Sequence, residues 1–108
     1  MSLNDFFTKT SKGLSDGGKL VVDGSGSGTG GVEIHEVFAS GGIELYKEVD
    51  TNDDGTYDLS VLIESQNDAF HSQENQIEIS EGENVQITLV NIDGSTIDCG
   101  VNGIEVSD

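Results

Sequence analysis

Residues 43–63 read IELYKEV–DTNDDG–TYDLSVLI, and this stretch decides the fold class. In the first run Ile43, Leu45 and Val49 share one face, and polar residues alternate with them. The alternating apolar positions of the second run are Tyr57, Leu59, Val61 and Ile63. A period of two is typical of strands with one buried face. The Gly-containing loop between the two runs predicts a β-hairpin.

The rest of residues 32–108 continues in the same manner. Further alternating runs are found at 32–39, 76–80, 84–92, 96–99 and 101–106, separated by short turns rich in Gly, Asp and Asn. The period slips near His35–Glu36, which predicts a β-bulge. Residues 65–75 are polar and are expected to form a connection. The pattern predicts an all-β fold, a seven- to eight-stranded antiparallel β-sandwich or jelly roll.

The N-terminal residues follow a different pattern. Residues 1–14 predict a short amphipathic helix, because Leu3, Phe6 and Phe7 fall on one side at helical spacing. Residues 19–23 predict one short strand. Residues 24–31, GSGSGTGG, have the composition of a flexible linker. We therefore divide the chain into an N-terminal anchoring arm (1–23), a Gly/Ser linker (24–31) and a β-sandwich domain (32–108).

The composition is strongly acidic. Asp and Glu number 21 against four Lys and no Arg, which gives a net charge of −17. Such a surface repels nucleic acid and anionic membranes, and it repels itself unless salt screens the charges. With its small aliphatic core residues, the whole chain resembles proteins of extreme halophiles, especially haloarchaea. An acidic domain from a mesophile is the alternative.

Charge also separates the arm from the body. Residues 1–22 carry a net charge of +1, and residues 23–108 carry −18. An almost neutral arm with two Phe residues is expected to dock on another subunit, and folding back onto its own body is the alternative. The expected partner-binding residues are Leu3, Phe6, Phe7, Lys9, Lys12, Leu20, Val21 and Val22.

The loop of the central hairpin resembles a calcium-binding loop. The sequence from Asp50 to Asp58, DTNDDGTYD, matches the first nine positions of the pattern D-x-[DN]-x-[DN]-G. The expected oxygen ligands are Asp50, Asn52, Asp54, Thr56 and Asp58. The twelfth position is Val61, where the motif requires a bidentate Glu. A solvated acidic hairpin loop is the alternative, so calcium is a possible ligand and no other cofactor is expected.

Residues 76–100 resemble the second half of cupredoxins, in the order strand, Gly turn, strand and N-x-D. The resemblance implies sandwich topology without copper, because no His or Met follows Cys99. Cys99 is expected to be a small buried residue. His35 and His71 are expected at the surface or at a sheet edge.

The sequence contains no arrangement of residues typical of an active site, so no enzymatic activity is expected. It shows no secretory signal and no apolar stretch long enough to span a membrane. In layout and composition the chain resembles small structural proteins (minor capsid, turret or decoration) of haloarchaeal viruses. That resemblance implies a non-enzymatic virion subunit, homo-oligomeric and bound to other structural subunits, with the arm as anchor. The alternative is a calcium-stabilised module that binds a surface or a glycan.

Overall fold

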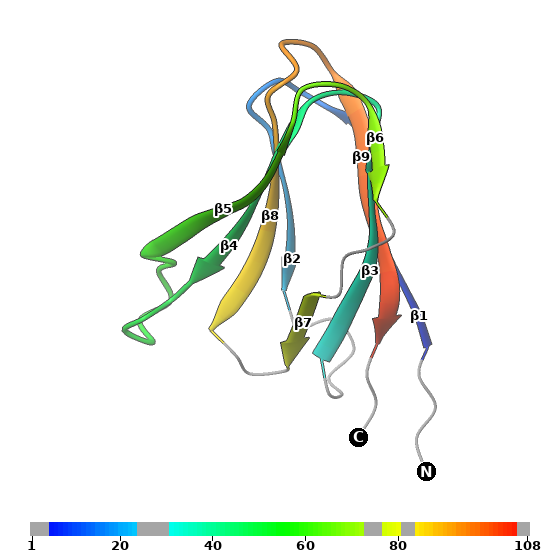
Figure 1. Ribbon diagram of the computed structural model, residues 1–108. Coiled ribbons are helices and arrows are strands. Elements are labelled where there is room, and N and C mark those ends of the chain that lie inside the picture. The colour runs from blue at the N-terminus through cyan, green and yellow to red at the C-terminus, as the bar shows by residue number, and fades with distance from the viewer. Residues whose placement is uncertain (1–4, 24–30, 73–76, 81–83, 106–108) are drawn as a thin grey trace.

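The computed structural model describes residues 5–23, 31–72, 77–80 and 84–105. Within these ranges the chain forms nine β-strands and no helix. The strands are β1 (Asp5–Leu14), β2 (Lys19–Asp23), β3 (Gly31–Ala39), β4 (Ile43–Val49), β5 (Leu59–Gln66), β6 (Phe70–Ser72), β7 (Ile77–Ser80), β8 (Val85–Asn91) and β9 (Ile97–Glu105). They form two antiparallel sheets that lie face to face (Figure 1).

The strand order is nested. One sheet, here called the β1 sheet, has the order β1-β9-β3-β6, and β7 also pairs with β3. The other, the β2 sheet, has the order β2-β8-β4-β5. The β9 strand occupies one side of β3. On the other side of β3, the short strands β7 and β6 lie in line, and they pair with residues 31–34 and 37–39 respectively. Each sheet thus has four strand positions, and the pairs β1:β9, β2:β8, β3:β6/β7 and β4:β5 follow the pattern of a jelly roll.

The core lies between the sheets and is built from small aliphatic side chains. Its buried members are Leu20, Val22, Val32, Ile34, Val37, Ala39, Ile43, Leu45, Ile79, Ile87, Leu89, Ile97, Cys99 and Val101. They come from strands of both sheets, so the two sheets share a single core. The expected all-β sandwich is confirmed.

The predicted N-terminal helix is wrong. Residues 5–14 form β1, which pairs with β9 from Asp5↔Glu105 to Ser11↔Cys99. An isolated helix of this length is marginal in water, whereas an edge strand gains ladder hydrogen bonds with a neighbour. The alternating Thr8 and Thr10 also favour a strand, because β-branched side chains suit one. Residues 1–4, including Leu3, lie outside the described part of the chain.

The described part of the predicted arm belongs to the sandwich. The β1 strand forms one edge of its sheet, and β2 forms one edge of the other by pairing with β8 from Lys19↔Val90 to Asp23↔Gln86. The arm therefore follows the alternative considered from the sequence, in which it folds back onto its own chain. Seven of the eight predicted linker residues, 24–30, lie outside the described residues, and Gly31 begins β3.

The remaining expectations about individual strands have different outcomes. The register of β3 against β9 shifts between Ile34 and Glu36, so the predicted bulge at His35 is confirmed. The second arm of the central hairpin begins at Leu59 rather than near residue 56, and its alternating apolar face is exposed instead of buried. The polar connection contains a short strand, β6, that the sequence pattern did not reveal. None of the described residues forms a helix long and apolar enough to cross a membrane.

Candidate functional site

The loop between β4 and β5 is organised around Asp50. Its carboxylate accepts hydrogen bonds from the backbone N–H groups of Gly55 at 2.8 Å and of Asn52 and Asp54 at 3.3 Å. Burial on its own raises the pKa of Asp50, but these donors outweigh it and hold the pKa below the usual range. Gly55 lies at φ 87°, where a residue without Cβ is favoured. The loop is thus held by its own first residue.

The other predicted calcium ligands also have partners within the loop. The Asp58 carboxylate accepts hydrogen bonds from the hydroxyl and the backbone N–H of Thr51, which lower its pKa. The Asn52 side chain donates to Asp58 at 3.5 Å, and the backbone N–H of Thr56 donates to Asp54 at 2.9 Å. Among the described residues no three His, Cys, Asp or Glu side chains form a group that could hold a metal ion. Calcium binding stays a prediction.

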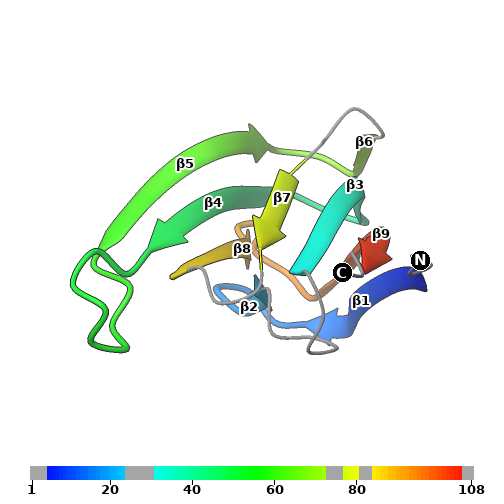
Figure 2. The same cartoon turned by 90° about the horizontal axis from the view of Figure 1, so that it is seen from below.

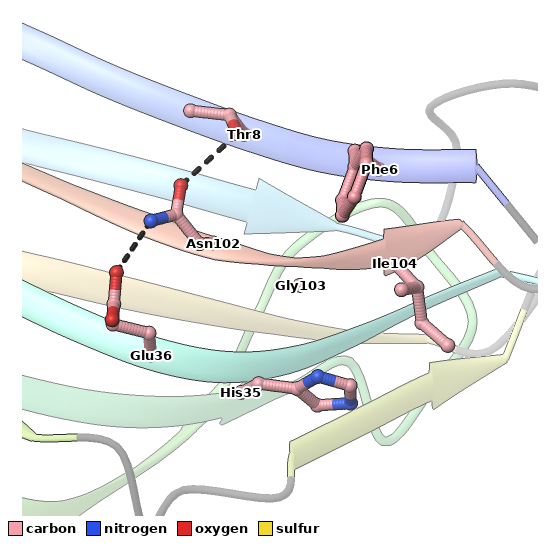
Figure 3. Close-up of a pocket in the computed structure, with 7 residues that line it drawn as sticks. All are labelled: Phe6, Thr8, His35, Glu36, Asn102, Gly103 and Ile104. Atoms are coloured by element: carbon pink, nitrogen blue, oxygen red, sulfur yellow. Dashed lines mark hydrogen bonds between the residues drawn. The ribbon is translucent and has the colours of Figure 1, made fainter.

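A shallow pocket of about 430 Å³ lies on the β1 sheet, on the face away from the core (Figure 3). It is lined by Phe6, Thr8, His35, Glu36, Asn102, Gly103 and Ile104. These residues come from three adjacent strands, β1, β9 and β3. The pocket contains none of the predicted calcium ligands. Of the predicted partner-binding residues, Phe6 is the one that lines it.

A row of polar side chains crosses this face of the β1 sheet. The Thr8 hydroxyl donates to the Asn102 side-chain oxygen at 3.0 Å, and the Asn102 side-chain amide donates to Glu36 (Figure 3). The other oxygen of Glu36 lies 2.7 Å from the His71 ring nitrogen Nε2. The row joins all four strand positions of the sheet, and it leaves these polar groups already paired with one another.

The floor of the pocket is a glycine at the bulge. A Cβ on Gly103 would lie 1.8 Å from the backbone oxygen of Glu33, so only glycine fits beside β3. The bulge turns both His35 and Glu36 toward the outer face, where His35 Nε2 lies 2.7 Å from a Glu33 carboxylate oxygen. The period slip in the sequence was the signal for this site, but only the pairing of β3 with β9 shows which residues gather there.

The predicted partner-binding residues fall into two groups. Leu20 and Val22 are buried in the core, and Val21 is half-buried on β2. Phe6 and Lys12 are exposed on β1, and Phe6 is 94% exposed. Of these five side chains, Phe6 and Lys12 are the exposed ones that a partner of the folded chain could contact.

The remaining two predicted partner residues on β1 are Phe7 and Lys9. The backbone of Phe7 lies in β1, and its side chain is outside the described part. The ammonium group of Lys9 donates to the backbone oxygen of Val21, which ties β1 to β2 at one open edge of the sandwich. Lys9 therefore acts within the fold.

The β5 strand exposes apolar side chains on both of its faces. Leu59, Val61, Leu62 and Ile63 are between 45% and 50% exposed. Val61 pairs with Lys47, and Leu62 pairs with Tyr46 across the hairpin, so the two side chains point to opposite faces. This surface was missed because the alternation at 57–63 was interpreted as a buried face. The signal for it is the uncharged sequence LSVLI at 59–63 in a chain of net charge −17.

Cys99 is buried, as expected. Burial raises the pKa of its thiol, and the neighbouring negative charge of Asp98 raises it further. The exposed His71 and the half-buried His35 are each paired with a glutamate rather than with each other. In the described structure the cysteine and the two histidines thus do not form part of a group that could hold a metal ion.

No family model matches the chain. The chain is 33% identical over 105 residues to Gp30 of Haloferax tailed virus 1, and the match covers 94% of this chain and 90% of Gp30. The chain belongs to the Gp30 family. Gp30 is a protein of a haloarchaeal tailed virus, and this relationship agrees with the strongly acidic composition of the chain.

Proposed function

We propose that this member of the Gp30 family is a non-enzymatic structural subunit of the virion of a haloarchaeal tailed virus. The observation that carries the proposal is the similarity, along almost the whole chain, to a protein of such a virus. The jelly-roll strand order supports it, because this architecture is common in viral capsid proteins. Among the described residues no three His, Cys, Asp or Glu side chains form a group that could hold a metal ion, and burial raises the pKa of the Cys99 thiol.

The acidic surface suits a subunit that faces concentrated salt. A net charge of −17 on a small sandwich disfavours the compact state in dilute buffer, because like charges repel over long distances. At about 1 M salt the Debye length falls to about 3 Å, and this repulsion is largely screened. A virion surface exposed to brine would therefore stay soluble without destabilising the fold of its subunits.

We place the anchoring contact at the N-terminal strand. The β1 strand is one edge of its sheet, and within the described residues no strand pairs with its outer side. Because Lys9 and Lys12 guard this edge against strand pairing, we place the contact on the exposed side chains of β1. Phe6, almost fully exposed on β1, would provide an apolar contact beside that edge, and Lys12 a positive charge. Leu20 and Val22 have no part in this contact, because they pack in the core.

Incorporation into particles tests the proposal. Virions are purified from infected cells on gradients at high salt, and the ratio of the chain to the main capsid protein is measured by quantitative mass spectrometry. A fixed ratio across the particle peak is expected. If the chain is abundant in the cell lysate and absent from purified particles, the proposed function is wrong.

A variant tests the anchoring contact separately. Phe6→Ala should lower the amount incorporated while leaving the fold unchanged, because the side chain contacts little of its own chain. Ile92→Ala, which truncates another exposed apolar side chain, is the matched control and should be incorporated normally. Equal incorporation of both variants and the wild type would place the anchor elsewhere.

A second candidate function is recognition of a surface glycan through the pocket on the β1 sheet. The observation that favours it is the exposed ring of Phe6 beside Asn102 and His35, since sugar rings stack on aromatic side chains. Screening against a glycan array at high salt tests it, with Phe6→Ala expected to abolish any signal. Addition of a chelator separates the calcium-stabilised version, because binding through the pocket alone should be unaffected.

A further inference from the structure

We infer that β5 is a self-association surface, on which a second copy of this chain docks by antiparallel pairing of the two β5 strands. The inference deepens the proposed function, because a structural subunit needs contacts with its neighbours. It rests on the exposure, charge and pairing of residues 59–63.

The first observation is that β5 has a free edge and two uncovered faces. It is the last strand of the β2 sheet, so within the described chain its outer side has no paired strand. Its loop-proximal end diverges from the β1 sheet in both views (Figure 1, Figure 2). Apart from Ser60, every residue from 59 to 63 is apolar and about half exposed: Leu59, Val61, Leu62 and Ile63. Exposed apolar edges of this kind mark association sites.

The second observation is that this edge lacks the charges that protect other edges. Natural sheets guard free edges with charged residues, especially Lys. The edges β1 and β2 carry Lys9, Lys12 and Lys19, which are three of the four lysines in the chain. Residues 59–63 carry no charge at all, although 21 of the 108 residues are acidic. Residues 59–63 of two acidic chains can therefore meet without opposing like charges. The flanking Asp58 and Glu64 would face each other at both ends of the pair, where salt must screen them.

The third observation is that the segment is complementary to itself. In an antiparallel pair centred on Val61, this residue faces its own copy, Leu59 faces Ile63, and Ser60 faces Leu62. Leu59 and Val61 pair with Val49 and Lys47 and so lie on one face, which both copies bring to the same side, whereas Ile63 is the extra residue at the register shift opposite Leu45 and Tyr46. The pairing joins two four-stranded sheets and brings the exposed apolar side chains of both copies into contact across the new pair.

The size of this contact sets the expected strength. Pairing of one short strand from each copy buries less than about 1,200 Å² in total, which is the lower range for specific complexes. The dimer should therefore depend on concentration. It should also strengthen with salt, because screening weakens the repulsion between two chains of charge −17.

Sedimentation equilibrium tests the inference on the full chain at about 1 M salt or above, where the Debye length is about 3 Å or less. The wild type should move from 11.4 kDa toward twice that mass as concentration rises. The variant Val61→Glu should stay monomeric, because it places two carboxylates opposite each other at the centre of the pair. Its fold should be preserved, since Lys47 lies opposite Val61 across the hairpin.

Ile92→Glu is the matched control. It makes the same change from an apolar to an acidic side chain at an exposed residue outside β5, and it should dimerise like the wild type. Val61→Cys gives an independent readout, because Cys99 is buried and the introduced thiols should form a disulfide between copies under mild oxidation.

Three results would overturn the inference: a wild type that stays monomeric at every concentration at high salt, equal dimerisation of Val61→Glu and the wild type, or no disulfide with Val61→Cys. Association of β5 with a different virion protein only would also overturn it. A monomeric chain that still enters virions would remove this inference and leave the proposed function standing. If the chain dimerises through β5 but is absent from virions, the inference would stand and the proposed function would be wrong.

Discussion

Asn91 joins three segments at one end of the sandwich, and changing it to Asp should strongly destabilise the fold. Its side chain is 1% exposed. The amide nitrogen donates to the backbone oxygens of Leu14 at 2.9 Å and Ser95 at 2.7 Å, and the amide oxygen accepts from the N–H of Asp93 at 2.8 Å. The substitution Asn91→Asp keeps the shape of the side chain but replaces the double donor with an oxygen.

The magnitude follows from the two lost donors. At the buried Asn91 side chain two carbonyl oxygens lose their partners, at about 1–3 kcal/mol each, and a carboxylate oxygen now faces both of them. We expect a loss of about 3–5 kcal/mol in the free energy of unfolding at neutral pH, in the range for broken buried polar contacts. A domain of this size is stable by only about 5–15 kcal/mol, so the loss is a large fraction of the total.

Urea unfolding at high salt, followed by circular dichroism, measures this loss. The free energy of unfolding falls by about 1–3 kcal/mol per molar urea, so the urea concentration at the unfolding midpoint should fall by roughly 2 M. The control Asn67→Asp makes the same charge change at an exposed position and should shift the midpoint little.

The pH dependence of this effect can refute the reasoning. Burial raises the pKa of the introduced carboxyl above its unfolded value, so its penalty is full above the folded pKa and shrinks as the pH falls through it. If the difference between Asn91→Asp and the wild type is below about 1 kcal/mol, or does not shrink on acidification, this account of Asn91 is wrong.

Three further predictions concern the bulge, the loop and the carboxylates. Gly103→Ala should cost about 3 kcal/mol or more, because its Cβ would lie 1.8 Å from a backbone oxygen; thermal unfolding measures this, and wild-type stability would contradict it. Asp50→Ala should lower the melting temperature by the same amount with and without calcium, because its carboxylate holds the loop N–H groups; a calcium-induced rise in the wild type alone would instead support a cation site. Hydrogen bonds to Asp93 from Ser95 and Gly42 lower its pKa, so the stability that it contributes is full above the usual carboxyl pKa of about 4 and is lost as the pH falls through the lowered value. Acid titrations of the wild type and Asp93→Asn at high salt should therefore converge at low pH, and parallel curves would refute this.

Local pattern predicted the fold class well where each strand has one buried face. The alternation in residues 32–39, 43–49 and 84–92 corresponds to β3, β4 and β8, and the slip at His35 corresponds to the bulge. The same reasoning failed at the N-terminus, because Phe6 and Phe7 fit a helical face and a strand equally well. Pairing with β9, more than 80 residues away in the chain, decides between the two.

The sequence by itself determined the all-β class, the aliphatic core and the acidic surface, because side-chain alternation and charge are local properties of the chain. Tertiary structure alone decided which alternating strands are covered. The β5 strand has the pattern of a buried strand, but it lies at the end of its sheet where the other sheet does not reach it. The pocket on the β1 sheet likewise exists only because β1, β9 and β3 are neighbours in space. Burial is a property of the layer opposite a strand, and a strand's own residues do not specify that layer.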